Sequence, residues 1–98
     1  MGYELETTGD FDDWLDGLGD QVACKAIVKR LLRAQSGLFG DCESVGGGVS
    51  ELRVHVGPGY RAYFVIRGRK LIVMLCGGSK KTQKRDIERA KEMANELG

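Results

Sequence analysis

The sequence predicts a single α+β domain in which a mainly antiparallel, twisted sheet packs against three helices. Three observations lead to this prediction. Two N-terminal stretches and one C-terminal stretch repeat apolar residues with the period of a helix. The region between them alternates apolar and polar residues as strands do, and glycine-containing segments divide it into short pieces. The chain has 98 residues, enough for one core, so we assign residues 1–98 to one domain.

The first 35 residues are predicted to form a strand and two helices. Residues 3–7 alternate as a short strand. The first helix has one apolar stripe, formed by Phe11, Trp14, Leu15 and Leu18. Thr8 or Asp10 can cap this helix and Gly19 can end it. The second helix spans residues 20–35, and its expected buried stripe is Ala23, Ala26, Ile27, Leu31 and Ala34.

The rest of the chain predicts four strands and a final helix. The strands are expected at residues 42–45, 49–56, 60–67 and 70–76, with turns at 46–48, 57–59 and 68–69. A helix over residues 82–97 has one apolar face, formed by Ile87, Ala90, Met93, Ala94 and Leu97. The expected order is therefore β-α-α-β-β-β-β-α.

The register of the two hairpins decides which residues share a face. We expect Val56 to pair with Tyr60 and Arg67 to pair with Lys70. One face, expected to receive the first two helices, then carries Leu52, Val54, Ala62, Phe64, Ile66, Leu71, Val73 and Leu75. The other face carries Val65, Ile72 and Met74, which need a cover, either the C-terminal helix or a partner chain.

Polar side chains gather at one end of that second face. They are Glu51, Arg53, His55, Arg61 and Tyr63. In the expected register Arg53 faces Tyr63, and His55 faces Arg61 with Cys76 nearby. A glycine-rich turn at residues 77–78 then brings Lys80 and Lys81 to the same edge.

Arginine binds phosphate in a bidentate manner, lysine supplies a point charge, and an exposed tyrosine can stack on a base. This pattern favours a phosphate-binding site on a sheet. The alternative is an ordinary solvated strand face, balanced by Glu51.

The charges and cysteines restrict the class of protein. Residues 1–20 contain seven acidic and no basic residues, whereas residues 21–98 carry 15 basic against seven acidic ones, a balance of +8. A basic body is compatible with a polyanionic partner, although ordinary charge scatter is the alternative.

The sequence shows no membrane-length apolar run and no secretory signal, and three separated cysteines suit reduced thiols, so we expect a cytoplasmic protein without a membrane role. One histidine and scattered cysteines give no metal-ligand spacing, and no cofactor motif is present.

Several segments resemble the RelE/ParE superfamily, and in particular the small "addiction module killer" or HigB-like toxins of bacterial type II toxin–antitoxin systems. The resemblance covers residues 11–97. The matching residues are Phe11, Trp14-Leu15, Gly37-Leu38-Phe39-Gly40-Asp41, Glu51-Leu52-Arg53-Val54, Gly57-Pro58-Gly59-Tyr60-Arg61-Ala62-Tyr63-Phe64, Leu75-Cys76-Gly77-Gly78-Ser79-Lys80-Lys81-Thr82-Gln83, Asp86-Ile87 and Ala90. The element order predicted above is also the order of that family.

The resemblance implies an mRNA endoribonuclease, ribosome-dependent or free, that inhibits translation without a metal or cofactor. Its partners would be mRNA, the ribosome, and a cognate antitoxin with a helix-turn-helix DNA-binding domain. The expected catalytic residues are Arg53, His55, Arg61, Lys80 and Lys81, and the expected RNA contacts are Tyr63, Gln83, Lys84 and Arg85. The alternatives are a ParE-like inhibitor of DNA gyrase on the same fold and a noncatalytic RNA- or protein-binding module.

The general base is the least determined part of this expectation. The ribose 2′-OH would attack the adjacent phosphate and leave a 2′,3′-cyclic phosphate, and a base must remove its proton. With one histidine in the chain, that base is His55 or a lysine. Neighbouring positive charges lower a lysine pKa. We therefore hypothesise that Lys80 or Lys81 is the base and that His55 assists.

Overall fold

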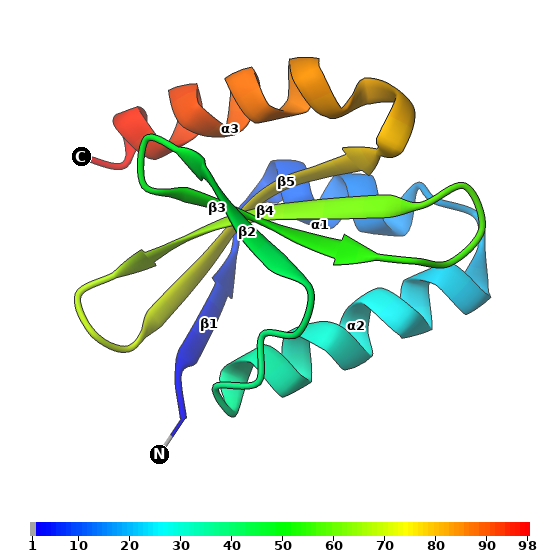
Figure 1. Cartoon of the computed structure of the whole chain (residues 1–98), viewed down its shortest axis with the longest axis horizontal. Helices are drawn as coiled ribbons and strands as arrows, with labels where there is room; N and C mark the ends of the chain where they lie inside the picture. Colours follow the sequence, from blue (N-terminus) through cyan, green and yellow to red (C-terminus); the bar gives the residue numbers. More distant parts are fainter. Residues whose placement is uncertain (1) are drawn as a thin grey trace.

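The structure, a computed structural model, describes residues 2–98 as a five-stranded mixed sheet packed against three helices (Figure 1). The strands stand in the order β1-β5-β4-β3-β2, and every neighbouring pair is antiparallel except β1 with β5. Within the described residues, no helix is both long and apolar enough to cross a membrane. Along the chain the elements are β1 (Glu4–Thr7), α1 (Gly9–Asp16), α2 (Gln21–Gln35), β2 (Cys42–Gly46), β3 (Val49–Val54), β4 (Tyr60–Arg67), β5 (Leu71–Ser79), a 3-10 turn η1 (Lys80–Thr82) and α3 (Gln83–Glu96).

Side-chain caps start the two N-terminal helices. The Thr8 hydroxyl accepts a hydrogen bond from the Phe11 N–H at 3.1 Å and donates to the Leu75 carbonyl at 2.6 Å, so it also ties α1 to β5. Of the two caps that the sequence allowed, Thr8 is therefore the one used. Asp20 caps α2 through the N–H groups of residues 22 and 23. Helix α1 ends at Gly17, two residues earlier than expected.

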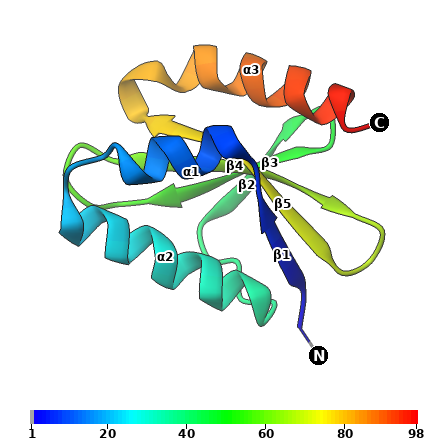
Figure 2. The ribbon, with the colours of Figure 1, turned by 180° about the vertical axis from the view of Figure 1, so that it is seen from behind.

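Helices α1 and α2 lie together on one side of the sheet, where Figure 2 shows them in front. The core on this side is apolar. Its buried members are Phe11, Ile27, Leu31, Ala34, Leu52, Val54, Ala62, Phe64, Ile72 and Met74. Burial of such side chains contributes roughly 1.5–3 kcal/mol each, so this cluster supplies a large part of the driving force for folding.

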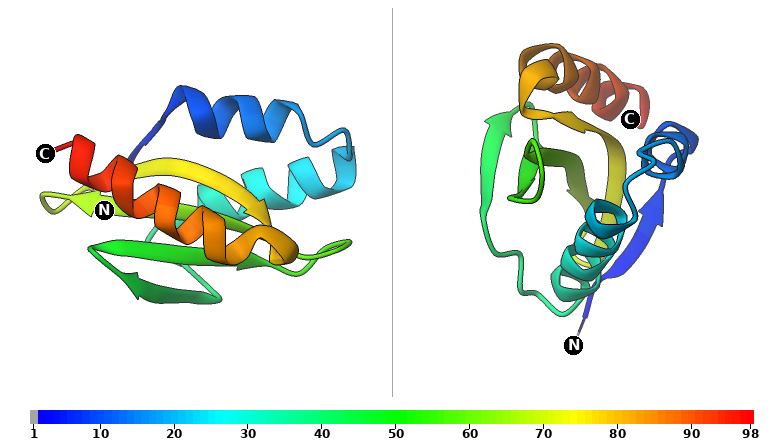
Figure 3. Two further views of the ribbon diagram at one scale, coloured as in Figure 1. Left: turned by 90° about the horizontal axis from the view of Figure 1, so that it is seen from above. Right: turned by 90° about the vertical axis from the view of Figure 1, so that its right-hand side faces the viewer.

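Helix α3 covers the second face of the sheet, apart from α2 (Figure 3). The buried side chains beneath it are Val49, Tyr63, Val65, Val73, Leu75, Cys76, Ala90 and Ala94. Of the two covers expected for Val65, the C-terminal helix is therefore the one that the structure shows. Leu97, expected on the apolar face of this helix, is 48% exposed.

The β4–β5 register corrects the face expected for β5. Arg67 pairs with Leu71, not with Lys70, because the turn has three residues and begins with Gly68 at a φ of +60°. A shift of one residue moves every side chain of a strand to the other face. Ile72 and Met74 therefore lie under α1 and α2, where they are buried, and do not form an exposed strip with Val65.

The β3–β4 register differs from the expected one by two residues. The N–H of Val56 donates to the Val54 carbonyl at 3.1 Å, and the N–H of Gly59 donates to the Val56 carbonyl at 3.0 Å. These turn hydrogen bonds end the ladder at Val54, which pairs with Tyr60. A shift of two keeps each residue on its face but changes its neighbour.

Arg53 consequently lies opposite Arg61, and Tyr63 lies opposite Glu51. His55 follows the end of β3, so it does not face Arg61. Cys76 pairs with Tyr63 instead of lying beside Arg61.

Gly77 and Gly78 are strand residues of β5, not the expected turn. A Cβ on Gly77 would lie 2.3 Å from the Trp14 ring, and a Cβ on Gly78 would lie 1.8 Å from the Asp86 carboxylate. The two glycines therefore allow α1 and α3 to approach the same strand from opposite faces.

Candidate functional site

A buried carboxylate is the centre of the polar cluster on the α3 side of the sheet. Glu51 is fully buried and accepts four hydrogen bonds. Its Oε1 accepts from Arg53 Nε and from Arg61 Nη1, both at 3.1 Å. Its Oε2 accepts from the Tyr63 hydroxyl at 3.1 Å and from Gln83 Nε2 at 2.8 Å. We call these five residues the Glu51 cluster.

Three elements assemble this cluster. Residues two apart on a strand share a face, so β3 supplies Glu51 and Arg53, and β4 supplies Arg61 and Tyr63 beside them. Gln83 reaches the same carboxylate from the start of α3. The sequence brought both arginines, Tyr63 and Gln83 into one site, but it assigned Glu51 only the role of balancing charge. Strand alternation alone had placed Glu51 on this face, but it did not show that Glu51 is fully buried.

The electrostatics of the cluster keep Tyr63 a hydrogen-bond donor. Burial is the main cause that raises the pKa of Tyr63 well above its ordinary value, and the negative charge of Glu51 adds to the shift. Tyr63 is fully buried. The expected exposed tyrosine that stacks on a base is therefore not what the fold provides, and Tyr63 instead orients Glu51.

The two arginines differ in how much of their guanidinium group is engaged. Arg53 contacts three carboxylates: Glu51, Asp41 at 3.2 Å, and Glu43. The Glu43 hydrogen bond is the main cause that raises its pKa. The Arg61 side chain makes one hydrogen bond within residues 2–98, through Nη1 to Glu51, and it is 13% exposed. Arg61 is thus the arginine with donors left for a ligand.

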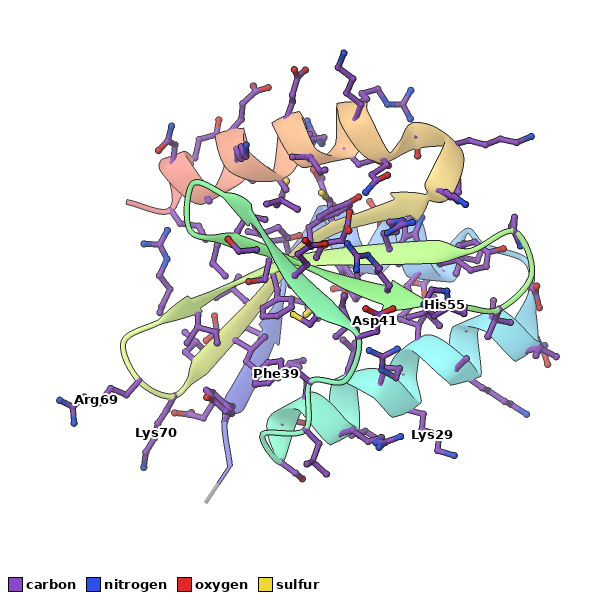
Figure 4. All side chains as sticks on the ribbon, viewed as in Figure 1. Lys29, Phe39, Asp41, His55, Arg69 and Lys70 are labelled. Atoms are coloured by element: carbon purple, nitrogen blue, oxygen red, sulfur yellow. The ribbon has the colours of Figure 1, made fainter. Side chains whose placement is uncertain are left out.

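His55 contacts Asp41 and not Glu51, and Figure 4 shows the two side chains close together. Its Nε2 is 2.6 Å from Asp41 Oδ2, and its side chain is 71% exposed. This hydrogen bond is the main cause that lowers the pKa of Asp41. Because Asp41 also binds Arg53, it connects the histidine to the Glu51 cluster. Asp41 was noticed in the sequence only as part of a glycine-containing run.

The expected lysines lie on the turn that leads into α3. Lys80 and Lys81 form η1 and are exposed. The N–H of Lys80 donates to the Gly59 carbonyl at 3.0 Å, which fastens this turn to the β3–β4 loop. Lys84 and Arg85 follow on the exposed first turn of α3. A shallow surface hollow is lined by Lys81, Thr82, Lys84, Arg85 and Glu88.

The geometry therefore divides the predicted site residues into two groups. The first group meets at one carboxylate: Arg53, Arg61, Tyr63 and Gln83. The second group does not contact Glu51 and lies just after β3, on η1 and on the first turn of α3: His55, Lys80, Lys81, Lys84 and Arg85. Within residues 2–98, no three His, Cys, Asp or Glu side chains are arranged to hold a metal ion. The arrangement provides cationic donors next to a rigid, desolvated anchor, which suits a phosphate group.

Comparisons with known proteins place the chain in a family. The model of the family described as "Phage derived protein Gp49-like (DUF891)" matches residues 13–96. An uncharacterized protein of Haemophilus influenzae is 45% identical over 98 residues, which cover 100% of this chain and 99% of that protein.

A solved structure has a similar fold. The solution structure of the conserved hypothetical protein HP0894 from Helicobacter pylori matches with a TM-score of 0.51 and 16% identity, covering 81% of this chain and 96% of that one. This likeness concerns the fold alone. The family match includes β2 to β5 and all of α3, and β3, β4 and α3 carry the cluster. The chain therefore belongs to the phage-derived Gp49-like family.

Proposed function

We propose that this member of the Gp49-like family is the toxin of a type II toxin–antitoxin module and acts as a metal-independent mRNA endoribonuclease that inhibits translation. The observation that carries the proposal is the half-engaged guanidinium of Arg61, which buried Glu51 holds. Arg61 pairs with Gly78 of β5, the strand that leads into the lysines of η1. The sequence resemblance to RelE/ParE toxins supports the choice of RNA. Translating ribosomes are the expected setting for cleavage.

Arg61 would stabilise the transition state of strand cleavage. When the 2′-OH attacks the phosphate, the O2′–P bond forms, the P–O5′ bond breaks, and negative charge builds on the non-bridging oxygens. A donor fixed in advance stabilises that charge without reorganisation. Glu51 accepts from Nη1 of Arg61, and Tyr63 and Gln83 hold Glu51 in turn. These three are positioning residues, since they act on the phosphate through Arg61.

Glu51 is not suited to be the base, because it is fully buried and already accepts four hydrogen bonds. The exposed groups near the cluster are Lys80, Lys81 and His55. One of the two lysines would take the proton of the 2′-OH, with His55 assisting, and the departing 5′-oxygen would take up a proton in return. Lys84 and Arg85 extend the positive surface along which the RNA backbone would lie.

The base assignment can be tested by single-turnover cleavage of an RNA fragment across a range of pH. The lysine assignment requires that Lys80→Ala or Lys81→Ala cleaves much more slowly than the wild-type chain. If both variants cleave at the wild-type rate and His55→Ala does not cleave, His55 is the base.

Three substrates test the function itself. The purified chain is added to naked RNA, to translating ribosomes, and to gyrase with supercoiled plasmid, and the products are examined for 2′,3′-cyclic phosphate ends. Cleavage of mRNA supports the proposal. Cleaved or trapped plasmid in the gyrase reaction identifies a gyrase inhibitor, and binding of RNA without cleavage identifies a noncatalytic module.

The partner that follows from this proposal is an antitoxin. A chain that halts translation must be neutralised in the cell that makes it, and the resemblance implies a helix-turn-helix DNA-binding protein for this task. Growth arrest on expression of the chain, relieved by co-expression of that protein, is the expected behaviour. Arrest that the antitoxin does not relieve would exclude this pairing.

A further inference from the structure

Helix α2 exposes large apolar side chains. Val22 is 69% exposed, Leu32 is 60% exposed and Val28 is 39% exposed. Val28 and Leu32 are four residues apart, so they are neighbours on the helix surface. The remaining exposed large hydrophobic residues lie singly, in a loop, a strand and the end of α3: Leu38, Ile66 and Leu97. Within residues 2–98, α2 is therefore the one element that gathers such residues on one face.

The same face is positively charged. Lys25, Lys29 and Arg33 are spaced four residues apart, are exposed, and form no ion pair within residues 2–98. Figure 4 shows Lys29 pointing from α2 away from the sheet. Residues 21–35 contain no Asp or Glu at all. We call the six side chains the α2 surface: Val22, Lys25, Val28, Lys29, Leu32 and Arg33.

We propose that the α2 surface is the docking site for an amphipathic helix of the antitoxin, one with an apolar stripe flanked by acidic side chains. The partner's identity as an antitoxin rests on the proposed function. The chemistry of the occupant rests on α2, because exposed apolar residues favour an apolar stripe and unpaired cations favour nearby carboxylates. The sequence left a partner chain as one possible cover for Val65, Ile72 and Met74, but the fold buries these residues.

A second copy of the chain fits this surface poorly. Packing α2 against α2 would bring unpaired cations together, and like charges across an interface are unfavourable. Helix α1 carries acids, Asp10, Asp12, Asp13 and Asp16, but none of the exposed large hydrophobic residues lies on it. RNA would use the cations and leave the apolar residues unused. A partner protein that supplies both acidic and apolar side chains uses the whole surface.

The α2 surface lies on the side of the sheet opposite to the Glu51 cluster (Figure 2). Docking there needs none of the proposed catalytic residues. The affinity for the antitoxin and the cleavage of RNA should therefore respond to different substitutions. In particular, Arg61→Ala should bind the antitoxin helix as the wild-type chain does.

The test uses the product of the gene adjacent to that of this chain as the binding probe. Its affinity is measured by biolayer interferometry for the wild-type chain, Val28→Asp/Leu32→Asp, Lys25→Glu/Lys29→Glu, Arg61→Ala, and the exposed controls Leu97→Asp and Arg69→Glu. Circular dichroism verifies that each variant is folded. Growth arrest on expression of the wild-type chain alone is recorded in parallel and tests the proposed function separately.

We expect the apolar double variant to lose about a hundredfold in affinity and the charge-reversal variant to lose about tenfold, with a slower association that depends on salt. The controls and Arg61→Ala should bind within about twofold of the wild-type chain.

Unchanged binding by both α2 variants would refute the α2 surface as the docking site and leave the toxin–antitoxin pairing intact. Absence of binding by the wild-type chain would overturn the inference, and growth arrest would then show whether the toxin proposal survives. An RNA fragment that binds the apolar variant normally and the charge-reversal variant weakly would assign α2 to nucleic acid instead.

Discussion

The two faces of the sheet bury their side chains in different ways. Under α1 and α2 the buried set is entirely apolar, with Phe64 stacked on Phe39 at a centroid distance of 5.6 Å. Under α3 the sheet buries apolar residues along most of its length and a carboxylate, Glu51, at one end. Both buried charged residues of the described chain, Glu51 and Asp86, lie on this second side.

This difference between the two faces suggests that one mainly stabilises the fold and the other serves the proposed function. An apolar core gains free energy from burial alone, whereas a buried ion pair recovers little more than its desolvation cost. A fold that needed only stability would not require the Glu51 cluster. The cluster is best explained by the rigid placement of Arg61. The two faces should therefore respond differently to substitution, and the following predictions measure that difference in order of size.

The largest effect on stability is expected on the α1–α2 face. Phe64→Ala should lower the free energy of unfolding by about 3–5 kcal/mol, because it removes a buried ring and leaves a cavity. Urea denaturation followed by circular dichroism measures the change. RNA cleavage per folded molecule should stay near the wild-type value. A loss of cleavage as large as that of an Arg61 variant would show that the two faces are not functionally separate.

Arg61→Ala should have the largest effect on activity. Removal of one preorganised donor raises a reaction barrier by roughly 3 kcal/mol, or about a hundredfold in rate. The measurement is growth after induction, followed by cleavage by the purified variant. Arg69→Ala, an exposed arginine in the β4–β5 turn, is the matched control and should remain toxic. Full growth arrest by folded Arg61→Ala would refute the assignment.

Two residues of the sheet, Phe64 and Met74, show how far the fold could be predicted from the sequence. Apolar periodicity was enough to place Phe64 on the face that receives α1 and α2, because strand alternation is a local property. The face of Met74 was predicted wrongly, since a three-residue turn in place of a two-residue turn reverses the side chains of β5 from Leu71 to Leu75, up to the irregularity in the β4–β5 ladder. Turn length depends on backbone hydrogen bonds that composition does not reveal.

The sequence predicted which residues form the candidate site better than it predicted the contacts among them. Strand alternation placed Arg61, Tyr63 and Glu51 together. The sequence could not show that Glu51 is buried, because Tyr63 of β4 and Gln83 of α3 meet its carboxylate only in the folded chain. It also could not show that Arg53 is surrounded by carboxylates, since Asp41 comes from the loop before the edge strand β2 and Glu43 from that strand.

Glu51→Gln should have a smaller effect than either variant above. The amide keeps the volume but removes the charge that Arg53 and Arg61 share, and its NH2 group meets donors. We expect a loss of about 1–3 kcal/mol in the free energy of unfolding, together with reduced cleavage. Glu43→Gln is the matched control, because Glu43 also binds Arg53 but is 60% exposed, and it should change stability little. Equal effects of the two variants would contradict the central role of Glu51.

The smallest expected effect is a pH dependence at the exposed edge of the cluster. The hydrogen bond from His55 is the main cause that lowers the pKa of Asp41 below its ordinary value of 3.8. A carboxyl group whose pKa is lower in the folded state stabilises the fold above its unfolded pKa, and this contribution disappears as the pH falls through the folded pKa. Asp41→Asn should therefore lower the denaturation midpoint slightly at pH 5–6. The difference from the wild-type chain should shrink as the pH falls below 3.8 and vanish once the pH is below the lowered pKa of Asp41. A difference that persisted unchanged in strong acid would mean that Asp41 acts through packing and not through its charge.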